Sequence, residues 1–257
     1  MTVKGITMVV LSVLVLGLGI LSSSCRTELK DIEEEGQEEV KEEKEEEETE
    51  DSGFTDLGLS VKWATFNLGA TKADKYGLYY QWGDTKGYER LFRAGKYFNL
   101  KDKDGKSFYK WYDATKDVLS KYNTKDVDGT VDGKLQIEAD DDAAVAALGG
   151  TWRIPTAAEW EELLDPSNCT WTWGNDGRCS GFYVKSKKNG NSIFLPLSGY
   201  RENDDPVVGL EEFGYYWSST LVPEDSWCVK SMIISKDWYG MEADYRYYGQ
   251  SIRPVCK

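Results

Sequence analysis

The residues with the clearest binding chemistry lie close to the C-terminus, in the segment 238–249. Aromatic rings stack on sugar rings or on protein side chains, and carboxylates accept hydrogen bonds from hydroxyl groups. The candidate ligand-binding residues of this segment are Trp238, Tyr239, Glu242, Asp244, Tyr245 and Tyr247. They predict a binding surface for a glycan or a protein ligand; the alternative is that the rings complete the core.

The sequence contains no histidine. It therefore lacks the commonest general base and the commonest transition-metal ligand, which excludes Ser-His-Asp and Cys-His catalysis and histidine-based zinc sites. The Asp-Gly turns at 101–105 and 126–129 do not reach the ligand pattern of a calcium loop. We expect no catalytic residue, no bound metal and no cofactor.

Four of the five cysteines lie in the second half of the chain, at Cys169, Cys179, Cys228 and Cys256. An even number of cysteines in an exported domain is typical of disulfide bonds, and four cysteines allow three pairings. Of these we favour Cys169–Cys179 and Cys228–Cys256. No Cys-x-x-Cys pair is present, so the sequence does not indicate a redox enzyme or a zinc ribbon.

The fifth cysteine, Cys25, follows a segment with the pattern of an export signal. Lys4 precedes an almost wholly apolar stretch at 6–21, and three serines stand directly before the cysteine. This order resembles a bacterial lipobox, in which the cysteine thiol receives a diacylglycerol and becomes the mature N-terminus. Residues 1–24 are therefore predicted to be a lipoprotein signal peptide, and Cys25 the lipidation site that anchors the protein in the outer membrane; the alternative is a plain secretory signal.

Residues 25–52 are predicted to be a disordered acidic linker. Positions 26–51 hold 15 acidic and 4 basic residues and so account for most of the formal net charge of −14. They contain few large apolar side chains and cannot bury a core. The chain after them is only mildly acidic, which speaks against binding to nucleic acid.

The remaining residues, 53–257, are predicted to form one α+β domain of twisted antiparallel sheets with two short helices. Alternating apolar residues indicate strands near 59–63, 76–82, 170–173, 214–220, 227–235 and 245–254. Asn189-Gly190 is typical of a two-residue hairpin turn, which predicts that Val184 pairs with Leu195.

Two helices are expected in this domain. Residues 140–148 begin with three aspartates, which suit the positive end of a helix, and two glycines follow that end it. The second helix begins after Thr156, because Thr156 and Glu159 have the spacing of a capping box. In it Trp160, Leu163 and Leu164 share one face, which we expect to be buried.

The stretch Trp-Arg-Ile-Pro-Thr-x-x-Glu-Trp at 152–160 resembles a motif of the C-type-lectin-like and formylglycine-generating-enzyme superfamily. More closely it resembles the Fibrobacter succinogenes major paralogous domain, which is common in surface lipoproteins of Bacteroidota. Further matching segments extend the resemblance from Phe54 to the C-terminus: 56–65, 76–84, 121–123, 140–144, 190–196, 214–219 and 252–255.

This resemblance implies a C-type-lectin-like fold and a location on the cell envelope. With the lipobox, it predicts a cell-surface lipoprotein with a non-catalytic domain that binds a glycan or a protein. One alternative is a structural or accessory subunit of a surface assembly, of the fimbrial-tip type. A second, less favoured, is a formylglycine-generating enzyme, whose activity needs a copper-binding cysteine pair. The sequence predicts neither the ligand nor the oligomeric state.

Overall fold

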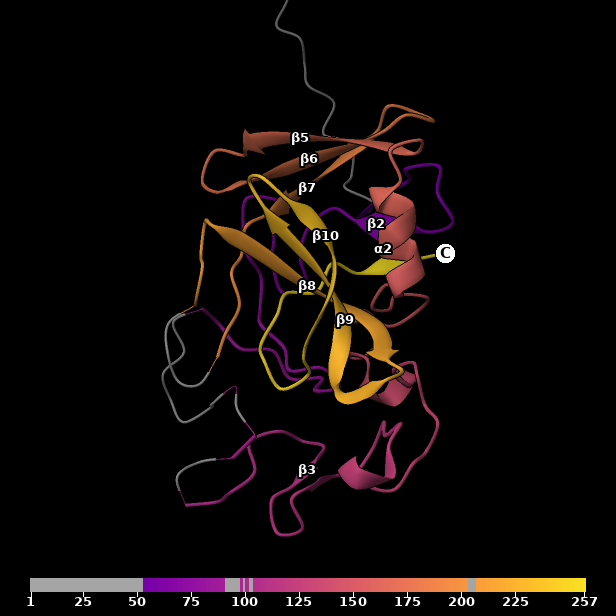
Figure 1. Cartoon of the computed structure of the whole chain (residues 1–257). Helices are drawn as coiled ribbons and strands as arrows, with labels where there is room; N and C mark the ends of the chain where they lie inside the picture. Colours follow the sequence, from indigo (N-terminus) through magenta and orange to yellow (C-terminus); the bar gives the residue numbers. More distant parts are fainter. Residues whose placement is uncertain (1–52, 91–97, 99, 102–103, 203–206) are drawn as a thin grey trace, which may run out of the picture. The chain divides into compact units, whose positions relative to one another are not determined.

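The computed structural model describes residues 53–90, 98, 100–101, 104–202 and 207–257, which are drawn in colour in Figure 1. They belong to the second of two compact units, residues 49–257. The predicted signal peptide, the lipidation site Cys25 and the acidic linker lie outside the described residues. In the described part of the chain no helix is both long and apolar enough to cross a membrane.

The described residues form mostly antiparallel β structure with two short α-helices, which confirms the predicted α+β class. Their sheets have the strand orders β1-β2-β11, β10-β9-β8, β3-β4 and β5-β6-β7. The strands are β1 (Phe54–Thr55), β2 (Lys62–Ala64), β3 (Tyr112–Asp113), β4 (Val118–Leu119), β5 (Cys169–Asn175), β6 (Ser180–Ser186), β7 (Ser192–Pro196), β8 (Phe213–Val222), β9 (Asp225–Ser235), β10 (Tyr239–Tyr245) and β11 (Val255–Cys256). The helices are α1 (Ala143–Leu148) and α2 (Ala157–Leu164), with single 3-10 turns at η1 (Asp126–Asp128) and η2 (Ala139–Asp141).

Helix α2 begins where the capping box predicts. The Thr156 side chain accepts a hydrogen bond from the Glu159 N–H at 3.2 Å, and the Glu159 carboxylate accepts one from the Thr156 N–H at 2.8 Å. Glu159 also pairs with the guanidinium of Arg153. Trp160 and Leu163 are buried as expected. Local sequence signals therefore place this corner of the fold correctly.

The predicted helix over 140–148 is divided into η2 and α1. Asp142 lies between them as the N-cap of α1 and accepts hydrogen bonds from the N–H groups of Ala144 at 2.8 Å and Val145 at 3.2 Å. Its second oxygen accepts the N–H of Ile154 at 2.8 Å. One buried carboxylate thus joins the start of α1 to the strand-like segment before α2.

Strand β8 of the β10–β9–β8 sheet is buried on both faces. Neighbouring residues of a strand point to opposite faces, and Tyr216 and Trp217 of β8 accordingly enter different hydrophobic clusters. Tyr216 packs with side chains of β6, β7 and α2, whereas Trp217 packs with side chains of α1 and of the segment 78–82. Figure 1 shows this sheet beside α2 and the β5–β6–β7 sheet.

The β6–β7 hairpin differs in register from the prediction. Val184 pairs with Ile193 instead of Leu195, and the connection is the four-residue loop 187–190. The side chain of Ser186 explains the longer loop, because its Oγ accepts the Lys188 N–H at 3.1 Å and donates to the Leu57 carbonyl at 2.6 Å. A shift of two residues keeps every side chain on its predicted face, so the apolar pattern alone cannot detect it.

The predicted strands near the two ends of the domain are shorter than expected. Residues 76–82 form only isolated bridges, from Tyr79 to Tyr88 and from Tyr80 to Gln250. The region 245–254 is mostly irregular: β10 ends at Tyr245, and the terminal strand β11 pairs with β2. The backbone hydrogen bonds of this region go to several separate segments of the chain. A prediction of one continuous strand, paired with one neighbour, does not anticipate this arrangement.

Candidate ligand-binding surface

The six residues predicted to bind ligand lie on β10 or next to it, at the edge of the β10–β9–β8 sheet, but they divide between two surfaces. Tyr239 stacks on Trp171 of β5, with ring centroids 4.5 Å apart and an interplanar angle of 14°. Trp238 beside it is 47% exposed, and Glu242 is exposed. The other three residues, Asp244, Tyr245 and Tyr247, lie at the far end of β10.

Tyr245 and Tyr247 belong to a cluster of five tyrosine rings that we call the tyrosine patch. It consists of Tyr200, Tyr215, Tyr245, Tyr247 and Tyr248. The centroid of Tyr200 lies 4.7 Å from that of Tyr215 and 5.4 Å from that of Tyr248. Tyr248 lies 5.0 Å from Tyr247 and 5.7 Å from Tyr245, and the rings of Tyr245 and Tyr247 are stacked at 5.2 Å. The five rings therefore form one continuous surface, in which Tyr245 is the most open at 45% exposure.

A turn directly after β10 carries the central pair of rings, and in it the Tyr248 N–H donates to the Tyr245 carbonyl at 3.0 Å. Arg246 in this turn is fully buried, whereas Tyr245 is exposed and its ring stacks on that of Tyr247. The Arg246 guanidinium donates to the Tyr109 hydroxyl at 2.7 Å and to three main-chain carbonyls, those of Lys121, Tyr122 and Ser226, at 2.9–3.0 Å. These four hydrogen bonds fix the direction in which the tyrosines point.

The main chain below the patch is held from both sides. On one side the N–H groups of Tyr80 and Gln250 each donate to the other's carbonyl at 3.0 Å. On the other side Arg201 and Gly249 exchange two backbone hydrogen bonds of 2.7 and 2.8 Å. The Gln81 side chain also donates to the Tyr247 carbonyl at 2.7 Å. The rings are thus mounted on a backbone with little freedom, which lowers the entropic cost of binding.

Two carboxylates accompany the tyrosines. The hydroxyls of Tyr200 and Tyr248 donate to the two oxygens of Glu202, over long distances of 3.4 and 3.3 Å. Asp244 accepts the Tyr245 N–H at 2.8 Å and the Gln250 side-chain amide at 2.6 Å. Burial, with a smaller contribution from the negative charge of Glu202, raises the pKa of Asp244 to about 6 against the lowering effect of its two hydrogen bonds.

The hydroxyls of Tyr200, Tyr215, Tyr247 and Tyr248 stay protonated at neutral pH. Burial raises the pKa of Tyr215 and of Tyr247 to about 12, and it raises the pKa values of Tyr200 and Tyr248 above their usual value as well. The neighbouring carboxylates add to this effect. The patch therefore combines neutral hydroxyl donors and aromatic faces with two negative charges.

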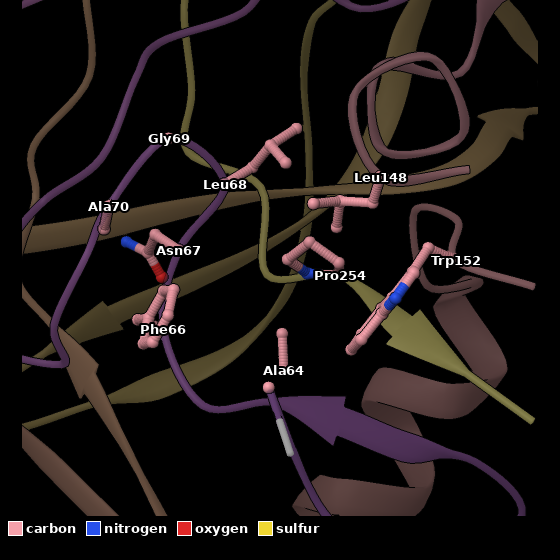
Figure 2. A pocket seen from close by; sticks show the side chains of 10 residues that line it. Ala64, Phe66, Asn67, Leu68, Gly69, Ala70, Leu148, Trp152 and Pro254 are labelled. Carbon is pink, nitrogen blue, oxygen red and sulfur yellow. The ribbon is translucent and has the colours of Figure 1, made fainter. Parts of the chain in front are cut away.

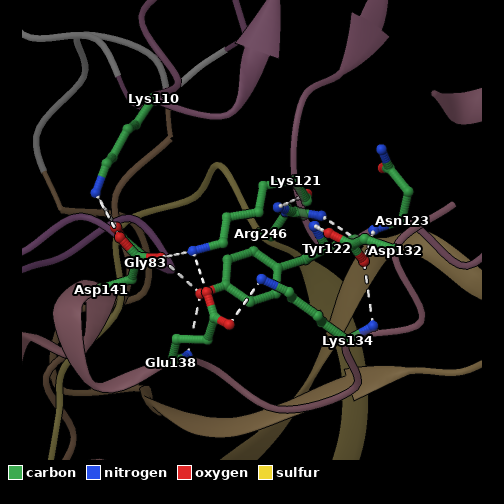
Figure 3. Close-up of polar contacts among 10 residues, drawn as sticks. All are labelled: Gly83, Lys110, Lys121, Tyr122, Asn123, Asp132, Lys134, Glu138, Asp141 and Arg246. Carbon is green, nitrogen blue, oxygen red and sulfur yellow. Dashed lines mark hydrogen bonds and ion pairs between the residues drawn. The ribbon is translucent and has the colours of Figure 1, made fainter. Parts of the chain in front are cut away.

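No lysine or arginine among the described residues pairs with either carboxylate. A contrasting arrangement surrounds Asp141, shown in Figure 3. There the carboxylate receives Lys110 at 2.8 Å, Lys121 at 2.6 Å and the Tyr122 hydroxyl at 2.6 Å. Lys121 also pairs with Glu138, so the charges compensate one another. We interpret the Asp141 cluster as structural.

The sequence reasoning assigned Asp141 to the helix dipole and did not foresee these lysines. It also missed Tyr200, Glu202 and Tyr215, which complete the tyrosine patch. All three lie 23 to 38 positions before the start of the segment 238–249 in the sequence. The pairing of Arg201 with Gly249 brings Tyr200 and Glu202 next to it. Tyr215 is brought there by β8, whose Tyr215 carbonyl accepts the Ser251 N–H at 3.0 Å. A run of aromatic residues signals one part of such a surface, and the rest depends on the fold.

An apolar cavity lies elsewhere, near the start of the described chain. It has a volume of about 280 Å³, and Figure 2 shows Phe66, Leu68, Leu148 and Trp152 around it. Its amide side chain, Asn67, already donates to the Tyr76 carbonyl and accepts from Arg253. The cavity therefore offers mainly apolar contact, and the Trp152 indole is the other side chain of its lining that has a polar atom.

The four cysteines of the domain are free thiols in the structure. The predicted Cys169–Cys179 bond is not formed: Cys169 pairs with Ser186, while Cys179 follows the turn at the opposite end of the same hairpin. Six strand residues separate the two ends by roughly 20 Å, whereas a disulfide needs Cα atoms within about 7 Å. Cys228 and Cys256 lie in different sheets, in β9 and β11, and their predicted bond is not formed.

In the part of the chain that the structure describes, no group of three or more acidic, cysteine or histidine side chains could hold a metal ion. No family model matches the chain, and no curated protein or solved structure is detectably similar to it. The site must therefore be judged from its own chemistry.

The raised pKa of Asp244 predicts a pH-dependent effect of Asp244→Asn. The folded-state pKa of about 6 exceeds the unfolded value, so ionisation of Asp244 lowers the free energy of unfolding as pH rises from about 4 to 6. Relative to wild type, the variant should therefore gain up to about 3 kcal/mol between pH 4 and pH 7. Urea unfolding at several pH values measures this. Asp140→Asn, at an exposed carboxylate, is the control; an equally flat pH dependence for both variants would contradict the burial of Asp244.

Proposed function

We propose that residues 53–257 are a non-catalytic binding domain, with the tyrosine patch as its ligand-binding surface. The observation that carries the proposal is the patch itself: five tyrosines and two carboxylates on a backbone held from both sides. The ligand class is a glycan or a protein. Both classes are recognised by aromatic faces together with a few polar groups of fixed position.

The physical advantage of such a surface is its low entropic cost. A tyrosine side chain has few rotatable bonds, and these five are restrained further by contacts with one another. The hydroxyls of Tyr200 and Tyr248 donate hydrogen bonds to Glu202, and Asp244 accepts hydrogen bonds from the Tyr245 N–H and the Gln250 side-chain amide. The patch can therefore satisfy polar groups of a ligand while it covers the apolar ones.

We further propose that the protein is a cell-surface lipoprotein of the outer membrane, anchored through Cys25, and that its domain has a C-type-lectin-like fold. The lipobox and the acidic linker support the anchor. The α+β structure with a capped helix at the motif 152–160 agrees with what the resemblance to the Fibrobacter succinogenes major paralogous domain implies. The linker would hold the patch away from the lipid surface.

The proposed surface predicts the effect of a double substitution. Tyr245→Ser with Tyr247→Ser removes the two stacked rings, so binding to a ligand found on glycan or peptide arrays should weaken at least about tenfold. Binding by the full chain is measured by surface plasmon resonance. Trp238→Ser removes an exposed ring from the other surface and should leave the affinity unchanged. If only Trp238→Ser weakens binding, the ligand binds there and the patch is not the site.

The anchor predicts the fate of a Cys25→Ala variant. Without the thiol no diacylglycerol can be attached, so the protein should leave the outer-membrane fraction. Labelling with a radioactive fatty acid, followed by fractionation, checks both statements. Fatty-acid labelling that persists in the variant, or wild-type protein without any label, would show that Cys25 is not the lipidation site.

A further inference from the structure

The charge of the tyrosine patch indicates which kind of ligand it binds; this inference rests on the proposed function. Glu202 and Asp244 lie close enough that the charge of Glu202 raises the pKa of Asp244. Both carboxylates also act on the hydroxyls of Tyr200, Tyr247 and Tyr248. Two negative charges thus share one partly buried surface, and no cation among the described residues pairs with them.

We propose that the tyrosine patch binds the guanidinium group of an arginine side chain presented by a protein partner. A positive charge placed between Glu202 and Asp244 would replace their mutual repulsion by two attractions. The partly buried position makes each attraction stronger than it would be in bulk water. The oxygens of Glu202 are available, because its two hydrogen bonds from tyrosine hydroxyls are long.

Arginine fits this surface better than other ligands. A guanidinium is planar and weakly hydrated, so it stacks on a tyrosine ring and donates in the ring plane to carboxylates at the same time. A lysine ammonium is compact and strongly hydrated, and it gains less from a flat aromatic face. A neutral sugar would stack on the rings but would leave the two negative charges uncompensated.

The interior of the same domain shows that this combination of groups is stable. The Arg246 guanidinium lies 5.3 Å from the ring centroids of Trp82 and Tyr109 and 5.7 Å from that of Tyr122. It also donates to the Tyr109 hydroxyl. The tyrosine patch also has aromatic rings, and its two carboxylates correspond to the main-chain carbonyls that accept hydrogen bonds from Arg246. The guanidinium itself would come from the protein partner.

The decisive comparison uses two probes that differ in charge and hardly in shape. N-acetyl-arginine methylamide carries the guanidinium, and the citrulline analogue replaces it with a neutral urea group. Binding of each to the full chain is followed by NMR titration. We expect the arginine probe to bind at least about tenfold more tightly than the citrulline probe, and its binding to weaken as salt is raised.

A matched pair of variants locates the effect. Glu202→Gln with Asp244→Asn keeps the shape of the patch and removes both charges, so the preference for arginine over citrulline should disappear. Asp140→Asn with Glu161→Gln removes two exposed carboxylates elsewhere and should leave the preference unchanged. The probe comparison on wild-type protein needs no substitution, and it remains decisive even if a variant folds poorly.

The outcomes separate this inference from the proposed function. Equal binding of both probes, or equal binding of a lysine probe, would overturn the assignment to a guanidinium. Saccharide binding that the Tyr245→Ser, Tyr247→Ser pair abolishes, without arginine binding, would also overturn it while the proposed function stands. If the protein binds neither a glycan nor a peptide in a way that depends on Tyr245 and Tyr247, the proposed function itself is contradicted.

Discussion

The buried guanidinium of Arg246 is the interaction on which the candidate surface depends. It satisfies a hydroxyl and three main-chain carbonyls that belong to separate segments, and no carboxylate is among its partners. Replacing it would leave those acceptors without a donor inside the protein. Its neighbours Tyr245 and Tyr247 belong to the same turn after β10, and their stacked rings are part of the tyrosine patch. The hydrogen bonds of Arg246 therefore hold the main chain that carries these rings.

The ion-pair partners of the carboxylates distinguish the structural cluster around Asp141 from the candidate binding surface around Glu202 and Asp244. Around Asp141, lysines and a tyrosine hydroxyl satisfy the carboxylate, as expected for an ion-pair network that holds loops together. Glu202 instead accepts hydrogen bonds from two tyrosine hydroxyls, Asp244 accepts them from the Tyr245 N–H and the Gln250 amide, and neither carboxylate forms an ion pair with a described lysine or arginine. Keeping such charges near one another lowers stability, and a ligand that compensates them recovers that free energy. Uncompensated charge beside aromatic rings is thus the feature of this domain that most directly indicates binding.

The sequence predicted features that depend on residues close together in the chain. It did not predict features that depend on contacts between distant residues. Thr156 and Glu159 lie three positions apart, so the start of α2 could be predicted. The β6–β7 register could not, because the contact between Ser186 and Leu57 spans 129 positions. For the same reason the segment 238–249 revealed only part of the patch. The number of cysteines also gives no information about strand register, and the register places Cys169 and Cys179 at opposite ends of the β5–β6 hairpin.

Amide hydrogen exchange in an Arg246→Met variant tests the central claim most directly. The account predicts exchange at least about tenfold faster in the segments 79–82 and 244–251, with α2 and the β5–β6–β7 sheet unaffected. Arg253→Met is the matched control, because Arg253 is equally buried but donates to Asn67 and to carbonyls of 64, 65 and 194. In Arg253→Met, amide exchange should become faster around residues 64–67 and 194 instead. Unchanged protection of 244–251 in Arg246→Met, or the same loss in both variants, would contradict the account.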